Sequence, residues 1–132
     1  MYFRSMTPNS DGLPNVASSK RSLGVMAEES NAPDGSFGPG TGGLSVSPDS
    51  PWNLPNHRRP RGMERGSTGV ATDWVFGIDG LSLTLAELVA RPDPNNPMGH
   101  AFVEPTKILS HEGYNGMLLK TRTYWRCKWP VV

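Results

Sequence analysis

A glycine-rich stretch followed by a pair of arginines is the part of this sequence best suited to bind an anion. Residues 38–43 read Gly-Pro-Gly-Thr-Gly-Gly, and glycine lets a backbone approach a bulky group closely. Arg58 and Arg59 follow on the far side of a short apolar segment. A guanidinium fork matches a pyrophosphate in both geometry and charge. The combination predicts a pocket for a phosphate-bearing ligand.

The other familiar chemical signatures do not fit. The glycine-rich stretch lacks the Gly-Lys-Ser/Thr ending of a phosphate-binding loop and is not followed by a helix pattern, which excludes that class of nucleotide site. The spacing of His57, His100 and His111 is not that of a metal site, so no metal is expected. Cys127 is the lone cysteine, and we expect a reduced thiol rather than a nucleophile.

Length and composition favour one loop-rich folded domain over residues 1–132. Glycine and proline make up 28 residues (15 plus 13), whereas 4 Trp, 3 Tyr and 4 Phe supply more apolar anchors than a disordered chain has. The net charge of +1 argues against a general nucleic-acid coat. No apolar run approaches the ~20 residues of a membrane span, and no secretory signal begins the chain. We therefore expect a cytoplasmic chain without a membrane segment.

Period-two patterns predict several short strands that would position these residues. A long segment without regular structure is expected over residues 48–69, and a helical turn followed by a strand over residues 81–91. The expected strands are Tyr2–Arg4, Ser22–Met26, Leu44–Ser47, Trp74–Ile78, His100–Glu104 and Lys107–Leu109.

The strongest helix pattern begins after Ser110, which is a good N-cap residue. Apolar or small side chains recur there at helical spacing, at Tyr114, Met117, Leu118, Thr121 and Trp125. The pattern predicts a helix that reaches Trp125 and docks this stripe onto a sheet.

Three polar residues stand in order on the expected strands: Arg4 on the first, Ser45 after the glycines and Glu104 at the end of a late one. Four segments around them resemble the family of type VI secretion effector toxins with an ADP-ribosyltransferase-like fold, which has bacterial and fungal relatives. These segments read Tyr-Phe-Arg (2–4), Gly-Thr-Gly-Gly-Leu-Ser-Val (40–46), Asn-Leu-Pro-Asn-His-Arg-Arg-Pro (53–60) and His-Ala-Phe-Val-Glu-Pro (100–105).

The resemblance implies an α+β fold, with a compact split β-sheet of the ADP-ribosyltransferase type, long loops and a C-terminal helix. It implies NAD as the ligand and a toxin that modifies an intracellular macromolecule, either protein or nucleic acid. A cognate immunity protein would neutralise the toxin in the producing cell, and a secretion system could deliver it into a target cell.

The chemistry of NAD cleavage assigns roles to the three residues. Loss of nicotinamide leaves an oxocarbenium-like sugar, whose charge a carboxylate such as Glu104 would stabilise. Arg4 would clamp the pyrophosphate, and Ser45 would hold the ribose or order its strand. The wider set expected to contact NAD also contains Tyr2, Gly42, Gly43, Trp52, His57, Arg58 and Arg59, with the last three on a mobile flap.

Two other functions stay open from sequence. The central arginines and the C-terminal basic residues could contact the phosphates of a nucleic acid, with tryptophans stacking on bases. The chain could also be a toxin fold that has lost activity. Transfer to an acceptor and simple hydrolysis of NAD are not separated by sequence.

Overall fold

Six short strands form one antiparallel sheet in a computed structural model that describes residues 1–131. The order across the sheet is β4-β5-β2-β1-β3-β6. The strands are β1 (Tyr2–Met6), β2 (Leu44–Pro48), β3 (Trp74–Ile78), β4 (Leu88–Pro92), β5 (Ala101–Pro105) and β6 (Arg126–Trp129).

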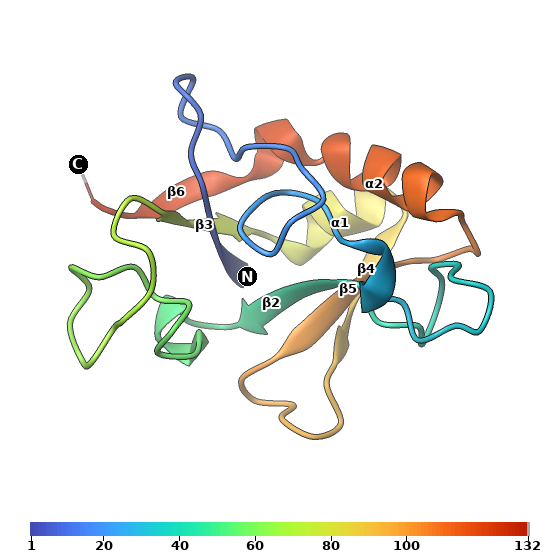
Figure 1. Ribbon diagram of the computed structural model, residues 1–132, viewed down its shortest axis with the longest axis horizontal. Coiled ribbons are helices and arrows are strands. Elements are labelled where there is room, and N and C mark those ends of the chain that lie inside the picture. The colour runs from blue at the N-terminus through green and yellow to red at the C-terminus, as the bar shows by residue number, and fades with distance from the viewer. Residues whose placement is uncertain (132) are drawn as a thin grey trace.

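The sheet divides between its two central strands. β1 and β2 share only the pairs Tyr2↔Pro48 and Phe3↔Ser47, whereas β2 pairs with β5 from Leu44 to Val46. β2 therefore changes its partner part-way along. In Figure 1, β1 lies with β3 and β6, and β2 lies beside the β4–β5 hairpin. The divergence leaves a space between β1 and β2 that side chains and loops must fill.

Two α-helices cover one side of the sheet. The first, α1 (Gly80–Leu85), begins at Asp79, whose carboxylate accepts a 2.7 Å hydrogen bond from the Ser82 backbone. The second, α2 (His111–Leu119), begins at Ser110, whose hydroxyl caps it at Gly113. The main core lies under these helices and includes Phe37, Leu44, Phe76, Val103, Tyr114, Leu118 and Trp125.

Segments at the two ends of β2 carry most of the irregular chain (Figure 1). The glycine-rich segment precedes β2, and residues 49–73 follow it. Leu54 and Met63 from the second segment pack with Phe3 of β1 and Val75 of β3 as a second, smaller core. Within residues 1–131, three short 3-10 helices lie in the loops: η1 (Ala27–Glu29), η2 (Pro51–Asn53) and η3 (Arg122–Tyr124).

The structure confirms the α+β class, the strands at residues 2–4, 44–47, 74–78 and 100–104, and the short helix followed by a strand at residues 81–91. Two predicted strands are wrong. Residues 22–26 form loop, and Leu109 makes only an isolated bridge to Phe37.

The C-terminal helix is shorter than predicted. It ends at Leu119, where the Thr121 hydroxyl donates to the Leu118 carbonyl at 2.7 Å, and the chain then enters β6 on the free edge of β3. Residues 121–129 are rich in Thr, Tyr and Trp, which favour a strand, and pairing with β3 outweighs the helical spacing of Trp125.

Candidate functional site

A cavity of about 240 Å³ opens where β1 and β2 diverge. Both strands contribute to its wall, and loops that come from three other parts of the chain close it. The lining residues are Arg4, Ser5, Lys20, Glu29, Ser45, Val46, Ser47, Leu54, Pro55, His57, Arg58 and His100. Four residues expected from sequence to contact one ligand are therefore brought together: Arg4, Ser45, His57 and Arg58.

Arg4 bridges the split in the sheet. Its Nη1 donates to the Ser45 carbonyl at 3.0 Å, and its other nitrogens donate to the carbonyls of Ser19 and Ser22. The side chain is 2% exposed. Burial, and secondarily the nearby charge of Arg58, lowers the pKa of Arg4 to about 10, so the guanidinium still carries its charge at neutral pH. The three partners are neutral carbonyls, which leave this buried charge without a counter-ion among the groups it bonds.

Ser5 presents a hydroxyl group that lacks a partner. The residue lines the cavity and is 3% exposed. Within residues 1–131, its Oγ is a buried side-chain oxygen without a hydrogen bond. Because an unpaired buried hydroxyl costs about 1–3 kcal/mol, this oxygen is expected to pair with a water or ligand atom in the cavity.

Two more cations reach the cavity from flexible side chains. Lys20 is exposed, and Arg58 lies half-buried with its guanidinium donating to the Lys20 carbonyl. The pKa of Arg58 is lowered, and the main cause is the desolvation of its guanidinium by burial. His57 is exposed beside it. The cavity is therefore lined by three cationic side chains, Arg4, Lys20 and Arg58, which favours an anionic ligand.

Glu29 is the carboxylate that lines the cavity. It ends the helix η1, and its Oε2 accepts a 2.7 Å hydrogen bond from the Met26 backbone. This contact fixes the side chain, while Oε1 has no hydrogen bond within the described part of the chain. Sequence reasoning missed Glu29 because nothing in its surroundings, Ala-Glu-Glu-Ser, distinguishes it from a surface residue.

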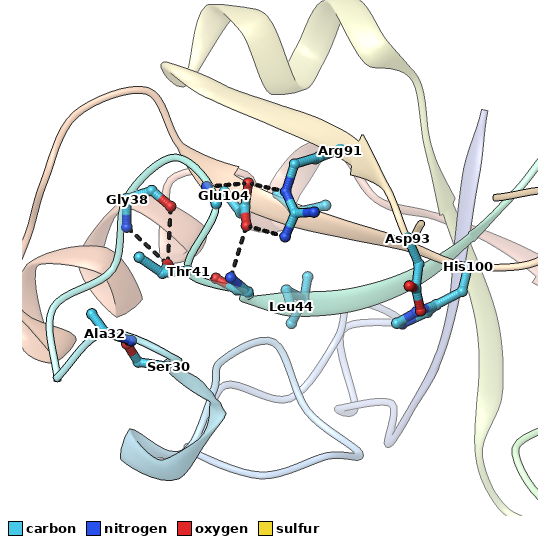
Figure 2. A network of polar contacts seen from close by, with 12 residues as sticks. Ser30, Ala32, Gly38, Thr41, Leu44, Arg91, Asp93, His100 and Glu104 are labelled. Carbon is cyan, nitrogen blue, oxygen red and sulfur yellow. Dashed lines mark hydrogen bonds and ion pairs between the residues drawn. The ribbon is translucent and has the colours of Figure 1, made fainter. Parts of the chain in front are cut away.

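Glu104 lies away from the cavity and is held by four donors (Figure 2). Arg91 binds it in a bidentate pair, with Nε and Nη2 at 3.0 and 2.9 Å from the two carboxylate oxygens. The backbone nitrogens of Gly40 and Gly42 donate at 3.1 and 2.8 Å. Glu104 is 1% exposed and does not line the cavity.

The glycine-rich loop is thus an anion cradle whose anion belongs to the protein itself. Gly40 and Gly42 adopt φ values of +85° and +83°, which turn their N–H groups toward the carboxylate and favour glycine. Gly43 lies against β5 and α2, where an added Cβ would be 2.7 Å from the Tyr114 hydroxyl. The predicted contacts of Gly42 and Gly43 with NAD are not supported, because neither residue lines the cavity.

Arg59 and Trp52 organise the loop that follows β2. Arg59 is 6% exposed and donates to the carbonyls of Leu54 and Arg65 at 2.7 and 2.8 Å. Its guanidinium also lies 5.6 Å from the centre of the Trp52 ring, and that of Arg65 lies 4.6 Å from it. Neither Arg59 nor Trp52 lines the cavity, and Arg59 ties its segment together instead of belonging to a mobile flap. Tyr2 packs against the main core, also outside the cavity.

A histidine and an aspartate form a pair at the cavity end of the β4–β5 hairpin. His100 lines the cavity, and its Nδ1 lies 2.8 Å from Oδ2 of Asp93. His100 directly precedes β5, whereas Glu104 lies near its end, and Figure 2 shows the pair well apart from Glu104. Four residues at roughly 3.3 Å each place Glu104 about 13 Å farther along the strand than His100.

Register explains most of what sequence reasoning missed at this site. From sequence, His100 is expected only at the start of a strand and is a poor candidate for a metal ligand, and Asp93 has no predicted role. The paired hairpin ends, with Asp93 N donating to the His100 carbonyl at 3.0 Å, bring the two side chains together. The sequence signal was an Asp and a His on either side of a Pro-Asn-Asn-Pro turn.

None of the helices between residues 1 and 131 is long and apolar enough to cross a membrane. Comparisons of the chain with family models, curated proteins and solved structures give no match.

Proposed function

We propose that this protein is an NAD-dependent ADP-ribosyltransferase that binds the dinucleotide in the cavity between β1 and β2. One observation carries the proposal. Arg4 and Ser45, which the family resemblance assigns to one site, line one cavity together with Arg58 and His57. Ser45, His57 and Arg58 lie 41 to 54 residues after Arg4 in the sequence, and the divergence of β1 and β2 brings the four residues together.

The fold supports the same proposal. The toxin family implies a split sheet, and here β2 exchanges its partner between β5 and β1. Arg4 stands on the first strand directly beyond the last β1–β2 pair, and its side chain spans the gap to Ser45. We therefore propose a fold of the ADP-ribosyltransferase type.

The charges of the cavity suit a pyrophosphate. Arg4, Arg58 and Lys20 line the cavity, and the Ser5 hydroxyl can donate to a phosphate or ribose oxygen of the ligand. At about 240 Å³ the cavity is smaller than the roughly 300–1,000 Å³ of most ligand pockets. It would enclose one end of the dinucleotide, with the remainder lying along the surface.

Two glutamates are candidates to stabilise the sugar cation, and the geometry favours Glu29. Glu29 already lines the cavity, with one carboxylate oxygen free of hydrogen bonds to residues 1–131. Glu104, the residue that the resemblance implies, would act only after Arg91 and the glycine loop released it. We assign the role to Glu29 in the conformation described here.

Binding is tested by thermal unfolding and calorimetric titration with NAD. A saturating ligand at 100 times its Kd stabilises the folded state by about 2.7 kcal/mol. Arg58→Gln and Ser5→Ala should weaken binding, whereas Arg61→Gln, an exposed arginine outside the cavity, is the matched control and should not. If NAD neither raises the melting temperature nor gives a binding heat, the proposal is wrong.

Transfer is tested with labelled NAD and a cell lysate. We expect label on a macromolecule with the wild type and a loss of about 10²-fold or more with Glu29→Gln, since one charge-stabilising group is removed from the transition state. A folded Glu104→Gln that is inactive beside an active Glu29→Gln would return the role to Glu104. Label only on free ADP-ribose would show hydrolysis instead of transfer.

The toxin assignment is tested in cells. Expression of the wild type should arrest growth, and co-expression of a cognate immunity protein should restore it. If cells that express the wild-type protein grow as fast as cells that express Glu29→Gln, a cytotoxic role is contradicted. The structure supports nucleic-acid binding less well, because the Arg59 guanidinium donates its hydrogen bonds to carbonyl groups of its own loop.

A further inference from the structure

The Asp93–His100 pair has the geometry of a general base and its orienting carboxylate. The Nδ1 to Oδ2 distance is 2.8 Å, and the backbone pairing of residues 93 and 100 fixes both side chains on one hairpin. The ring of Phe102 meets the imidazole edge-on at 4.6 Å between centroids. The imidazole is therefore held from two directions.

The hydrogen bond decides which nitrogen of His100 can accept a proton. An ionised carboxylate only accepts, so Nδ1 must carry the hydrogen in the pair. The bond to His100 is the largest cause that lowers the pKa of Asp93, which keeps this carboxylate ionised at neutral pH. Nε2 of the neutral ring is then unprotonated, and the residue lines the cavity.

We propose that Asp93 and His100 activate a hydroxyl-bearing acceptor for ADP-ribosyl transfer in this cavity. The inference rests on the proposed function and deepens it by naming the acceptor class: an alcohol, such as a serine, threonine or ribose hydroxyl, or water when no acceptor is bound. A guanidinium acceptor carries a positive charge that the cations lining the cavity repel, whereas a neutral alcohol is not repelled and needs a base to take its proton as it attacks.

The step balances without another reactant. Nε2 of His100 takes the proton from the acceptor hydroxyl, whose oxygen forms a bond to the C1 carbon of the nicotinamide ribose. The bond from that carbon to the pyridinium nitrogen breaks, and its electron pair leaves with neutral nicotinamide. Asp93 stabilises the imidazolium, which later loses its proton to solvent. Glu29, which lines the same cavity, stabilises the positive charge that develops on the sugar.

Charged groups of several elements lie next to this pair or share the cavity with His100. Arg91 on β4 lies 5.1 Å from the centre of the Phe102 ring and next to Asp93. The remaining charged or titratable groups line the cavity, namely Arg4 on β1, Lys20 in the first loop, Glu29 on η1, and His57 and Arg58 after β2. Bound pyrophosphate would offset their positive charge and leave His100 beside the reacting sugar.

The test is the pH profile of nicotinamide release from NAD by the full-length protein, with an added alcohol acceptor and without one. Protonated His100 cannot accept a proton, so the wild-type rate should fall on the acid side. His100→Gln should lose roughly 10²-fold or more in rate and lose the acid limb, with binding of NAD retained. Asp93→Asn should lose at least about tenfold, because the imidazole can then take the other tautomer.

Two further measurements keep the outcomes separate. His57→Gln changes a histidine on the same cavity without a carboxylate partner in the described structure, and it should alter KM while keeping the acid limb. Nitrogen-15 NMR of the imidazole tests the pair without turnover and should show the Nδ1–H tautomer for His100 in the wild type and a shift in Asp93→Asn.

A wild type that neither binds nor cleaves NAD would remove the proposed function and this inference with it. If the wild type is active and the fall in rate on the acid side persists in His100→Gln, the inference alone is overturned. The pair would then only stabilise the hairpin. Label found on guanidinium or amide groups would likewise contradict the acceptor class, without contradicting transfer.

Discussion

Replacing Glu104 with glutamine should destabilise the fold strongly, because the change breaks a cradle of four donors. One amide oxygen can still accept two of them. The amide nitrogen then faces the other two, either Gly40 and Arg91 Nε or Gly42 and Arg91 Nη2. A buried donor left without an acceptor costs about 1–3 kcal/mol, and breaking a buried ion pair costs about 3–5 kcal/mol. The side chain of Arg91 is 33% exposed, so water recovers part of this loss.

We therefore expect Glu104→Gln to lower the free energy of unfolding by about 3 kcal/mol. For a chain of this size the melting temperature should fall by roughly 10 °C. Urea unfolding followed by circular dichroism measures the first quantity, and a thermal scan measures the second. Glu87→Gln is the matched control, since its pair with Lys107 at 3.4 Å leaves side chains 59% and 58% exposed, and it should change stability by less than about 0.5 kcal/mol.

The double variant Glu104→Gln with Arg91→Gln separates the ion pair from the backbone bonds. A coupling free energy of about 1–2 kcal/mol is expected for two residues in direct contact. A loss below 1 kcal/mol in Glu104→Gln itself would refute the reasoning. It would mean that the glycine loop opens in solution and leaves Glu104 accessible, which would favour its predicted catalytic role over that of Glu29.

Three further perturbations test the frame of the site. Gly43→Ala should reduce stability by more than about 2 kcal/mol in urea unfolding, because its Cβ would overlap the neighbouring strand, whereas Gly116→Ala, which meets open space within a helix, should increase stability by up to about 1 kcal/mol. Arg59→Ala should cost about 2 kcal/mol and expose its loop to limited proteolysis, because several carbonyls lose a charged donor. The hydrogen bond from Arg122 lowers the pKa of Asp11, so this pair stabilises the fold above the ordinary aspartate pKa and is lost as pH falls through the lowered value; Asp11→Asn should flatten the acid limb of stability measured from pH 6 to 2.

The sequence was informative where a local pattern determined the structure. Alternation predicted the central strands, and the family resemblance assigned Arg4 and Ser45, on two of them, to one site. Backbone pairing explains why this worked, since β1 and β2 are neighbours in the sheet and a side chain as long as arginine can span the gap where they diverge.

Predictions that depended on register were less successful. The register of β4 against β5 decides whether Glu104 faces the cavity or is held by Arg91 and the glycine loop. The pairs Val89↔Glu104 and Arg91↔Phe102 place Arg91 diagonally beside Glu104. A single sequence contains no signal for that alignment. The glycine-rich stretch was expected to line a pocket for a phosphate-bearing ligand, but the anion that its N–H groups bind is the carboxylate of Glu104, 62 to 64 residues away in the same chain.

The separation of these two anion sites bears on how the cavity would work. The backbone donors of the glycine loop are occupied by Glu104, so they offer nothing to a ligand. The cations of the cavity are different, because Arg4 bonds neutral carbonyls and Arg58 bonds the Lys20 carbonyl. Since the pKa of Arg4 is about 10, its buried charge persists throughout the physiological range. A bound phosphate would supply the negative charge that these residues lack.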